Sequence, residues 1–406
     1  MSARISRVEF VAMMAMSFAT IAITIDAMLP AVPEITETLS PNEPNKVQLI
    51  ITLFMLGMGL GTLFVGPISD AVGRKPVILG GAALYIASAL VAWQSRSLEV
   101  LLIARFFQGM GASGPRVVTL AVVRDLFDGR DMARIMSFVL TVFTLVPAIA
   151  PLMGSGIIAL AGWRAIFLAF VLFSVISTAW ILLRLDEPLE PARRRPFRAS
   201  SILSAVKEVI STPEVRVSIG VQALIFGMMF SMLSSVQMIY DLRFGHNDLF
   251  PWIFGGIALL AGCSSMINAA IVMKIGMRTI VTAALSTQVC ASAIMIVTCL
   301  LTPPDTVFFV IFVCWQATVF LQLGFTMGNI NAFAMEPMGH IAGLAASIIA
   351  AIGTVIGVVI AIPVGLAFDG TPLPLAGGIF VFAVLAVLLM RRLRHIHRKR
   401  AEAPAE

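Results

Sequence analysis

Residues 64–78 read FVGPISDAVGRKPVI, a short polar loop between two long apolar runs, near 47–69 and 77–94. The loop carries two basic residues, Arg74 and Lys75, and each flanking run approaches the roughly 20 residues that cross a bilayer core as a helix. The runs show little alternation of apolar and polar residues, which favours helical spans over an outer-membrane barrel. The sequence therefore predicts a pair of membrane helices joined by a basic loop.

The rest of the chain has the same character. Of its 406 residues, 59% are hydrophobic and only 12% charged, and the mean hydropathy is +0.98. A water-soluble domain of this length could not bury so much apolar surface. No cluster of nucleophiles, metal-ligand spacing or phosphate loop is visible, so we expect no enzyme, no metal and no cofactor. Because there is also no ATP-binding motif, the energy source must be an ion gradient.

Counting apolar runs predicts twelve spans, near 9–30, 47–69, 77–94, 99–123, 135–160, 164–184, 216–240, 251–273, 279–301, 306–334, 341–367 and 375–392.

The distribution of basic residues predicts the orientation, because Lys and Arg are retained in the cytoplasm. With both termini in the cytoplasm, 22 of the 28 basic residues lie on the cytoplasmic side and four, namely Lys46, Arg96, Arg164 and Arg243, on the outer side. The net charge of +6 is thus explained by topology, and we expect no nucleic-acid partner. The expected partners are the lipid bilayer of a bacterial inner membrane and a small-molecule substrate, and we expect a monomer.

A long polar interruption divides the spans six and six, and a weak internal repeat supports this division. INAAIVMKIGMRTIV (267–281) joins two spans as residues 64–78 do, and it aligns Gly276 with Gly73. The predicted fold is an all-α membrane protein of two parallel-repeat six-helix bundles. Its predicted parts are an N-terminal bundle (1–184), a cytoplasmic linker (185–215), a C-terminal bundle (216–392) and a basic tail (393–406).

Several motifs resemble a known transporter family. GPISDAVGRKP (66–76) resembles the signature between helices two and three of the major facilitator superfamily, and RFFQGMGASG (105–114) resembles its helix-four motif. The bicyclomycin-resistance-type drug:proton antiporters are similar to this chain at DAMLPAVPEI (26–35), Ala-Pro-x-x-Gly (150–154), GWRAIF (162–167) and MEPMGHIAG (335–343). The resemblance implies proton-coupled multidrug efflux of small, partly apolar compounds by alternating access. It does not identify the substrate, so a dedicated metabolite exporter or an uptake symporter on the same fold is the alternative.

Among the 22 carboxylates, only Asp26 is predicted to lie well inside a span. An ionisable group in hydrocarbon is costly and is by default a functional residue, and the resemblance implies a proton site in the first helix. The alternative is a helix-end Asp hydrogen-bonded near the outer surface. At 1.5 Å per residue, Asp26 and Arg105 lie at similar depths, and the resemblance implies that helices one and four both line the cavity. Together these predict a pair, direct or through substrate or water, that serves proton coupling and substrate binding. The alternative is a static ion pair that orients two helices. One lone acid favours H⁺ over Na⁺ as the coupling ion.

Further substrate-binding candidates lie on two predicted helices. Gln108 is nearly on the Arg105 face, and Arg116, eleven residues after Arg105, returns to that face about three turns lower. Arg116 either binds an anionic substrate group or extends to the inner headgroups as a structural residue. In the second half, Gln237 and Tyr240 are the candidates, three residues apart on one predicted helix.

The 66–76 loop predicts a conformational latch. Its glycines let backbones approach, and Asp70 can meet a positive helix N-terminus. The resemblance implies that Asp70 stabilises the outward-facing state together with Arg74 and an acid after helix four, for which we choose Asp125. The predicted latch residues are Gly66, Asp70, Gly73, Arg74, Lys75 and Asp125.

The fifth predicted span carries an antiporter-like motif. Pro147, Pro151 and Gly154 would loosen or kink the helix and permit close packing. The family's antiporter signature is Gly-Pro-x-x-Gly-Gly, whereas residues 150–155 read APLMGS and depart from it at two positions. Ala-Pro is the form associated with the bicyclomycin-type branch, so we favour export over uptake.

Overall fold

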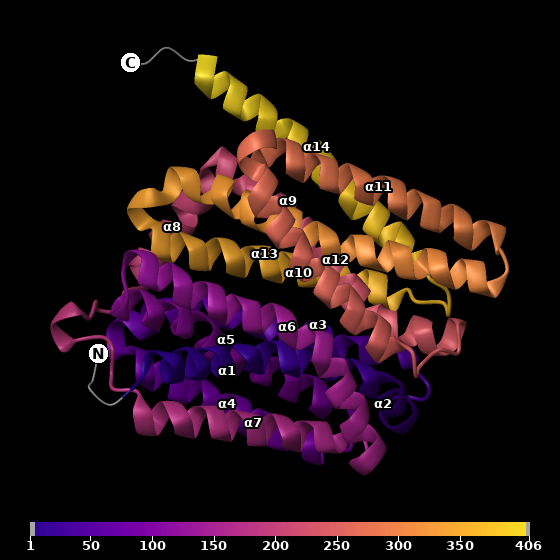
Figure 1. The fold of residues 1–406 in the computed structure, drawn as a ribbon, viewed down its shortest axis with the longest axis horizontal. Coiled ribbons are helices and arrows are strands. Elements are labelled where there is room, and N and C mark those ends of the chain that lie inside the picture. Colours follow the sequence, from indigo (N-terminus) through magenta and orange to yellow (C-terminus); the bar gives the residue numbers. More distant parts are fainter. Residues whose placement is uncertain (1–4, 403–406) are drawn as a thin grey trace. The chain divides into compact units, whose positions relative to one another are not determined.

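The computed structural model describes residues 5–402, and over this range the regular structure is helical. The described chain forms two compact units, Met1–Arg198 with Asp248–Gly256 and Ala199–Asn247 with Ile257–Glu406. Twelve of its α-helices have 20 or more residues (Figure 1). The first unit contains α1 (Arg7–Asp26), η1 (Leu29–Ala31), α2 (Val32–Leu39), η2 (Pro44–Gln48), α3 (Leu49–Val72), α4 (Arg74–Gln94), α5 (Leu98–Leu126), α6 (Gly129–Ala161), α7 (Arg164–Arg184) and η3 (Pro191–Arg193).

The second unit begins inside the predicted linker, with the short helix α8. The long helix α14 continues past the predicted end of the last span, because the basic residues that follow are good helix formers and no Pro or Gly interrupts them. The helical elements that follow the first unit are α8 (Ala199–Ser211), α9 (Pro213–Met238), the π turn η4 (Ile239–Arg243), α10 (Phe250–Ile275), α11 (Met277–Leu301), α12 (Asp305–Met335), η5 (Glu336–Ile341), α13 (Ala342–Leu366) and α14 (Leu373–Glu402), the start of α10 belonging to the first unit.

Most of the long helices are apolar enough to cross a membrane. Ten segments of the described chain meet this criterion, and one of them, Asp305–Leu366, contains both α12 and α13. The long helix α5 is not among the ten, because Arg105, Gln108, Arg116 and several glycines interrupt its apolar residues. Helix α5 is therefore less apolar than its neighbours α1, α3 and α4, because it carries Arg105, Gln108 and Arg116, three of the predicted site residues.

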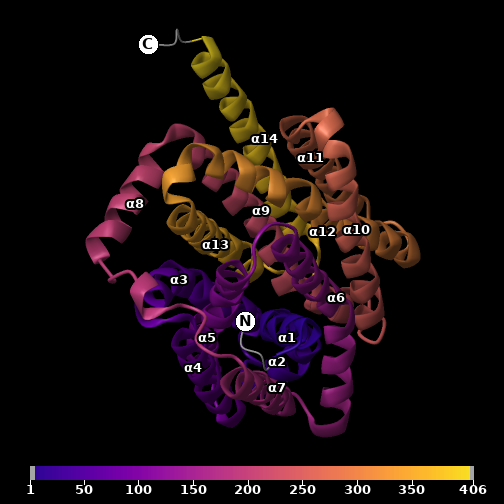
Figure 2. The ribbon, with the colours of Figure 1, turned by 60° about the vertical axis from the view of Figure 1, so that its left-hand side comes forward.

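Close helix packing positions that polar helix within the first unit. Helix α5 contacts α1, α3 and α4, and α1 lies among α5, α6 and α7 (Figure 2). A Cβ atom at Gly57 of α3 would collide with the carbonyl oxygen of Phe106, and one at Gly109 of α5 with that of Phe54. Small residues at such crossings let two backbones meet. The side chains of α5 are thus fixed close to the backbone of α3.

The two aligned glycines of the internal repeat adopt the same role in the structure. Gly73 separates α3 from α4 with φ +115°, and Gly276 separates α10 from α11 with φ +86°. These positive φ angles are strained for residues with a Cβ atom. Both glycines therefore let one long helix end and the next begin without an intervening loop.

Replacing these two glycines with alanine should have different effects. Each substitution stores backbone strain of about 1–3 kcal/mol. In Gly73→Ala the new Cβ would also lie 2.8 Å from Oε2 of Glu187, whereas at Gly276 no atom lies within 4 Å. We expect Gly73→Ala to lower the thermal unfolding temperature in detergent more than Gly276→Ala. Equal losses in the two variants would contradict the steric role of Glu187.

Candidate functional site

Asp26 lies where the first helix stops. Helix α1 ends at Asp26, and the apolar segment continues through a turn, η1 and α2. The Asp26 side chain is buried, with 6% of the residue exposed, and among residues 5–402 it has no hydrogen-bond or ion-pair partner. A helix C-terminus carries partial negative charge, so an ionised carboxylate buried there is costly. Asp26 thus lies at a helix end, as the alternative expects, but within the described chain it lacks the hydrogen bond that this alternative requires, and its role stays a prediction.

Arg105 is a fully buried cation that joins three helices. Its Nε donates to the Ile50 carbonyl of α3 at 3.2 Å, and its Nη2 donates to the Thr24 carbonyl of α1 at 3.4 Å. The guanidinium also lies over the Phe54 ring, 4.4 Å from its centroid, a favourable cation–π contact. No ion pair joins Arg105 to Asp26, so the direct form of the predicted pair is not formed. The two side chains are connected through α1, since Thr24 lies two residues before Asp26.

Gln108 completes the surroundings of the guanidinium. Its Oε1 accepts a hydrogen bond from Nη1 of Arg105 at 2.7 Å. Its Nε2 is buried and has no partner among the described residues. An unpaired buried amide donor is unfavourable unless a ligand or water meets it. Gln108 therefore has one amide donor beside the Arg105 cation that is not used, and its role in substrate binding stays a prediction.

Tyr85 of α4 was not predicted as a site residue. Its hydroxyl shares a hydrogen bond of 2.5 Å with Oγ1 of Thr24, whose own carbonyl binds Arg105. The chain has 27 Phe but only two Tyr, Tyr85 and Tyr240, and both are buried. A buried Tyr in an apolar helix usually needs a partner for its hydroxyl. This scarcity is the sequence signal that could have identified Tyr85.

The antiporter-like motif packs against the turn that follows Asp26. Pro147 and Pro151 lie inside α6, which continues as a helix to Ala161. A Cβ atom at Gly154 would collide with the carbonyl oxygen of Ala27. The predicted close packing is therefore present at Gly154, and it places the backbone of α6 against the residue next to Asp26.

Arg116 stays apart from this network. Its side chain is partly exposed, and within the described part of the chain it has neither a hydrogen-bond nor an ion-pair partner. Its two predicted roles, anion binding and a structural residue at the headgroups, both stay predictions.

In the second unit, Gln237 and Tyr240 bind separate partners. Nε2 of Gln237 donates to Oδ1 of Asn247. The Tyr240 hydroxyl donates to Oε1 of Gln316 at 2.8 Å, and its ring packs edge-on against Phe309. Tyr240 lies in the π turn η4, where the helical spacing changes. Such turns are frequent at functional sites. The Tyr240 hydroxyl is occupied by a protein partner, whereas Oε1 of Gln237 is buried and has no hydrogen-bond partner among the described residues.

Arg74 brings the predicted latch acids together. Its Nη1 donates to Oδ1 of Asp70 at 2.5 Å, and its Nε donates to Oδ2 of Asp125 at 2.7 Å. Ser69 accepts a third bond from Nη1 at 2.7 Å and donates to the carbonyl of Gly66 at 2.8 Å. A largely buried guanidinium shared by two carboxylates is a strong charge-assisted contact. The end of α3, the start of α4 and the end of α5 are thereby tied together.

The positive end of α4 is met by Glu187, not by Asp70 as predicted. Oε1 of Glu187 accepts the backbone N–H of Arg74 at 2.8 Å, and Oε2 accepts that of Lys75 at 3.0 Å. Asp70 instead binds the Arg74 side chain, because Gly73 ends α3 and the chain turns before α4 begins. Nζ of Lys75 donates to the Leu182 carbonyl of α7 at 2.8 Å. Glu187 was thus missed, and its position within the predicted linker gave no signal.

Removal of the Glu187 carboxylate should destabilise the first unit. In Glu187→Ala, two N–H groups at the start of α4 lose their acceptor, which typically costs about 1–2 kcal/mol. Glu190→Ala is the matched control, because Glu190 is exposed and its side chain has no hydrogen-bond partner in the described chain. We expect thermal unfolding in detergent to shift down only for Glu187→Ala. Similar curves for both variants would contradict the capping role.

Comparison with known proteins shows which family and fold this chain resembles. Residues 10–362 match the family model of the Major Facilitator Superfamily. A bicyclomycin resistance protein homolog from Haemophilus influenzae is 30% identical over 333 residues, covering 80% of this chain and 81% of that protein. A chloramphenicol resistance protein from Pseudomonas aeruginosa is 37% identical over 158 residues, 38% of each chain. Among solved structures, a D-xylose-proton symporter shares the fold, with a TM-score of 0.74, 13% identity, and coverage of 94% of this chain and 97% of that one.

Proposed function

Because this chain belongs to the major facilitator superfamily and is a transporter rather than an enzyme, we propose that it exports small, partly apolar compounds in exchange for protons. In this proposal twelve helices span a bacterial inner membrane as two six-helix bundles, with both termini in the cytoplasm. The relatives named for resistance to bicyclomycin and chloramphenicol support drug-like compounds as substrates.

The observation that carries the proposal is the unpaired carboxyl of Asp26. An exchanger needs one group that binds a proton in one half of the cycle and responds to substrate in the other. A buried carboxyl without a protein partner is free to do both. In the proposal, a buried cation that contacts the same helix responds to the charge of this carboxyl. Arg105, which bonds to the Thr24 carbonyl two residues earlier, is that cation.

The contacts around Asp26 suggest how proton binding changes the conformation. In the proposal, an ionised Asp26 draws the end of α1 and Arg105 closer together, and the 3.4 Å bond between Nη2 and the Thr24 carbonyl opposes this movement. When Asp26 is protonated, that attraction ends and the bond to Thr24 is restored. Since Gly154 of α6 packs directly on Ala27, movement at the end of α1 is transmitted to α6. The two charge states thus favour two arrangements of the same helices, as alternating access requires.

The ion pairs of Arg74 could stabilise one of the two conformations. In the proposal, the contacts of Arg74 with Asp70 and Asp125 close in one conformation and open in the other. Polar networks with two discrete arrangements are suitable for this purpose.

The experiment that tests the function is transport in proteoliposomes with a pH-sensitive dye enclosed. Cationic, zwitterionic and neutral compounds would be added in turn, with and without an imposed pH gradient. For an exporter of the proposed kind, protons and compound move in opposite directions. Movement in the same direction would indicate an uptake symporter, and transport that ignores the pH gradient but follows a sodium gradient would contradict proton coupling.

A further inference from the structure

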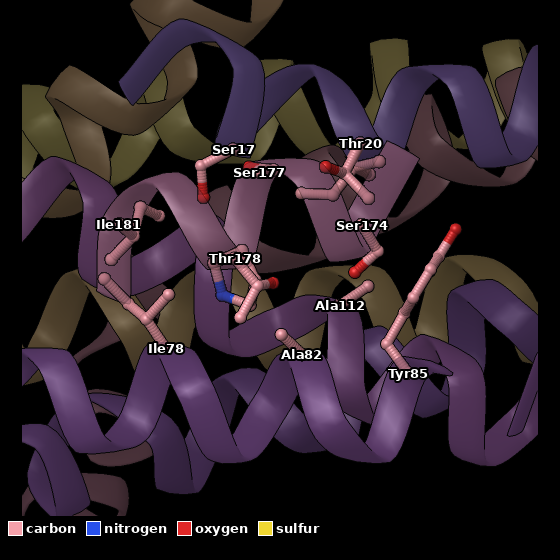
Figure 3. Close-up of a pocket in the computed structure, with 12 residues that line it drawn as sticks. Ser17, Thr20, Ile78, Ala82, Tyr85, Ala112, Ser174, Ser177, Thr178 and Ile181 are labelled. Atoms are coloured by element: carbon pink, nitrogen blue, oxygen red, sulfur yellow. The ribbon is translucent and has the colours of Figure 1, made fainter. Parts of the chain in front are cut away.

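The small cavity of the first unit has no room for a ligand. It lies among α1, α4, α5 and α7, and its volume of about 10 Å³ is close to the least that holds one water molecule (Figure 3). The further binding surface that the structure offers lies on the outside of the second unit, on the short helix α8.

Helix α8 exposes two large apolar side chains although it is not a membrane span. It has 13 residues, too few to cross a bilayer core of about 30 Å. Leu203 is 71% exposed and Ile210 45%. On the long helices such side chains are covered by lipid tails, but α8 lies outside the spans. Single exposed leucines are common on protein surfaces, so the arrangement of these two on the helix decides whether they form a binding surface.

The apolar side chains of α8 form one continuous half of the helix. In one part of this half, Ala205 and Val209 are buried, and α8 contacts α13. At about 100° per residue, Leu203 and Ile210 lie within about 20° of each other and continue the apolar half beyond the buried part. The remaining half is polar and consists of Ser200, Ser201, Ser204, Lys207, Glu208 and Ser211. Helix α8 is therefore amphipathic, and protein covers only one part of its apolar half.

The position of α8 places the open part at the level where helices leave the membrane. One residue, Thr212, separates α8 from α9, which begins a segment apolar enough to cross a membrane. On the polar side of α8, Nε2 of His340 donates to Oε1 of Glu208 at 2.6 Å. His340 lies in η5, directly before α13. Helix α8 is therefore held where α9 and α13 begin, and contacts on two sides fix its rotation about its own axis.

Lys207 borders the open apolar part. It lies four residues after Leu203 and three before Ile210, which places it beside both on the helix surface. It is exposed, and its ammonium group has no partner in the described part of the chain. Amphipathic helices with basic residues at the edge of their apolar side lie in the plane of the membrane surface. A lysine at this edge can extend to anionic headgroups while its stem stays beside the apolar side chains.

We propose that α8 binds the surface of the bilayer, with Leu203 and Ile210 among the acyl chains and Lys207 at anionic headgroups. The occupant of the open part is a lipid surface because the next helix crosses the membrane and the bordering charge is complementary to anionic lipids. The contact between His340 and Glu208 turns the polar half of α8 away from the lipid.

Spin labels on α8 test this placement in the full chain, in vesicles of phosphatidylcholine and phosphatidylglycerol in equal parts. Leu203→Cys and the matched control Ser204→Cys are neighbours on the apolar and polar sides, and both positions are exposed, so the chain should fold normally. Each label is measured for collisions with oxygen, which dissolves in lipid, and with a neutral, water-soluble nickel chelate. Alanine would first replace the four native cysteines, Cys263, Cys290, Cys299 and Cys314.

The ratio of oxygen to nickel collisions gives the answer. Burial of one aliphatic side chain favours the immersed position by about tenfold, so the ratio should be higher at 203 than at 204 by about that factor. Equal nickel collisions at the two positions would place the apolar side of α8 in water and overturn the proposal. A label at 203 that is shielded from both reagents would show that protein covers this side, from a second copy of the chain or another partner, and would overturn it as well.

A charge-reversal pair tests the contact with headgroups. Leu203→Lys and Leu203→Glu both keep good helix formers at an exposed position, and a label at Ile210→Cys reports on the same side of α8. In the anionic vesicles, nickel collisions at 210 should be lower in the Lys variant than in the Glu variant, by about fivefold for each unit of charge. In phosphatidylcholine alone the two variants should agree. Equal values in both kinds of vesicle would overturn the headgroup contact.

This inference requires that α9 crosses the membrane, and it does not rest on proton exchange. Asp26→Asn should leave the collision ratios at 203 and 204 unchanged, whatever it does to proton-driven transport. If proton coupling survives in Asp26→Asn, the proposed function fails while the labels still decide where α8 lies. If coupling is lost but the labels at 203 and 204 behave alike, the membrane contact of α8 alone is wrong.

Discussion

Asp26→Asn is expected to abolish proton-driven transport while substrate exchange continues. Asparagine keeps the size of the side chain but cannot take up or release a proton. The rate of transport driven by a pH gradient should fall by at least about a hundredfold, equivalent to about 2.7 kcal/mol in the activation barrier. Exchange of labelled for unlabelled substrate across the same liposomes needs no proton release and should persist.

The same variant should fold normally, and the reason is specific to this structure. Asp26 has no ion pair or hydrogen bond in the described chain, so Asn removes no contact. It also removes an ionisable group from the C-terminal end of α1, where negative charge is unfavourable. We expect the free energy of unfolding to change by no more than about 0.5 kcal/mol, as for substitutions that break no contact.

Glu37→Gln is the matched control for Asp26→Asn. Glu37 lies in α2 of the same apolar segment, but it is exposed and its side chain has no partner among the described residues. Neutralising it should leave both proton-driven transport and exchange near wild-type rates. Undiminished proton-driven transport by Asp26→Asn, or an equal loss in Glu37→Gln, would contradict the assignment of the proton to Asp26.

The sequence predicted the structure well where charge and chain direction restrict which residues can meet. A basic loop between two apolar runs leaves few ways to place Asp70, Arg74 and Asp125, because all three lie at helix ends that must meet on one side of the bundle. The aligned Gly73 and Gly276 were likewise visible as the points where two long helices turn.

The sequence was uninformative where backbone atoms or distant loops provide the partner. Depth along two helices placed Asp26 and Arg105 in one layer, but it could not show that carbonyls of Ile50 and Thr24 bind the guanidinium. A carbonyl oxygen is present at every residue and leaves no mark in the pattern of side chains. Glu187 was missed for a different reason. Its carboxylate caps α4, but it lies more than a hundred residues from that helix in the sequence, and nothing in the pattern links the two.

The second half shows how local helix geometry limits such predictions. Gln237 and Tyr240 are three residues apart, which on a regular α-helix places them on one face. The helix changes to a π turn at Ile239–Arg243, so that spacing no longer applies. Their side chains accordingly bind different partners, Asn247 and Gln316.

Arg105→Lys is expected to be the most damaging conservative change in α5. The guanidinium reaches Ile50, Thr24 and Gln108 through three different nitrogens while its plane lies over Phe54. An ammonium group has one nitrogen and no plane, so it cannot reproduce this arrangement. We expect two of the three buried acceptors to lose a bond to a charged donor, at a cost of about 1.5–3 kcal/mol for each bond.

The loss should appear in transport as well as in stability, because Arg105 holds the part of α1 that carries Asp26. We expect both proton-driven transport and substrate exchange to fall by about a hundredfold in Arg105→Lys, since two lost bonds weaken the site by about 3 kcal/mol. This differs from Asp26→Asn, which should spare exchange. Arg124→Lys is the matched control, because Arg124 lies on the same helix but is exposed and without a partner in the described chain. If Arg105→Lys retained full exchange, the guanidinium would be a replaceable positive charge, and the contacts with the Thr24 and Ile50 carbonyls would have no part in forming the site.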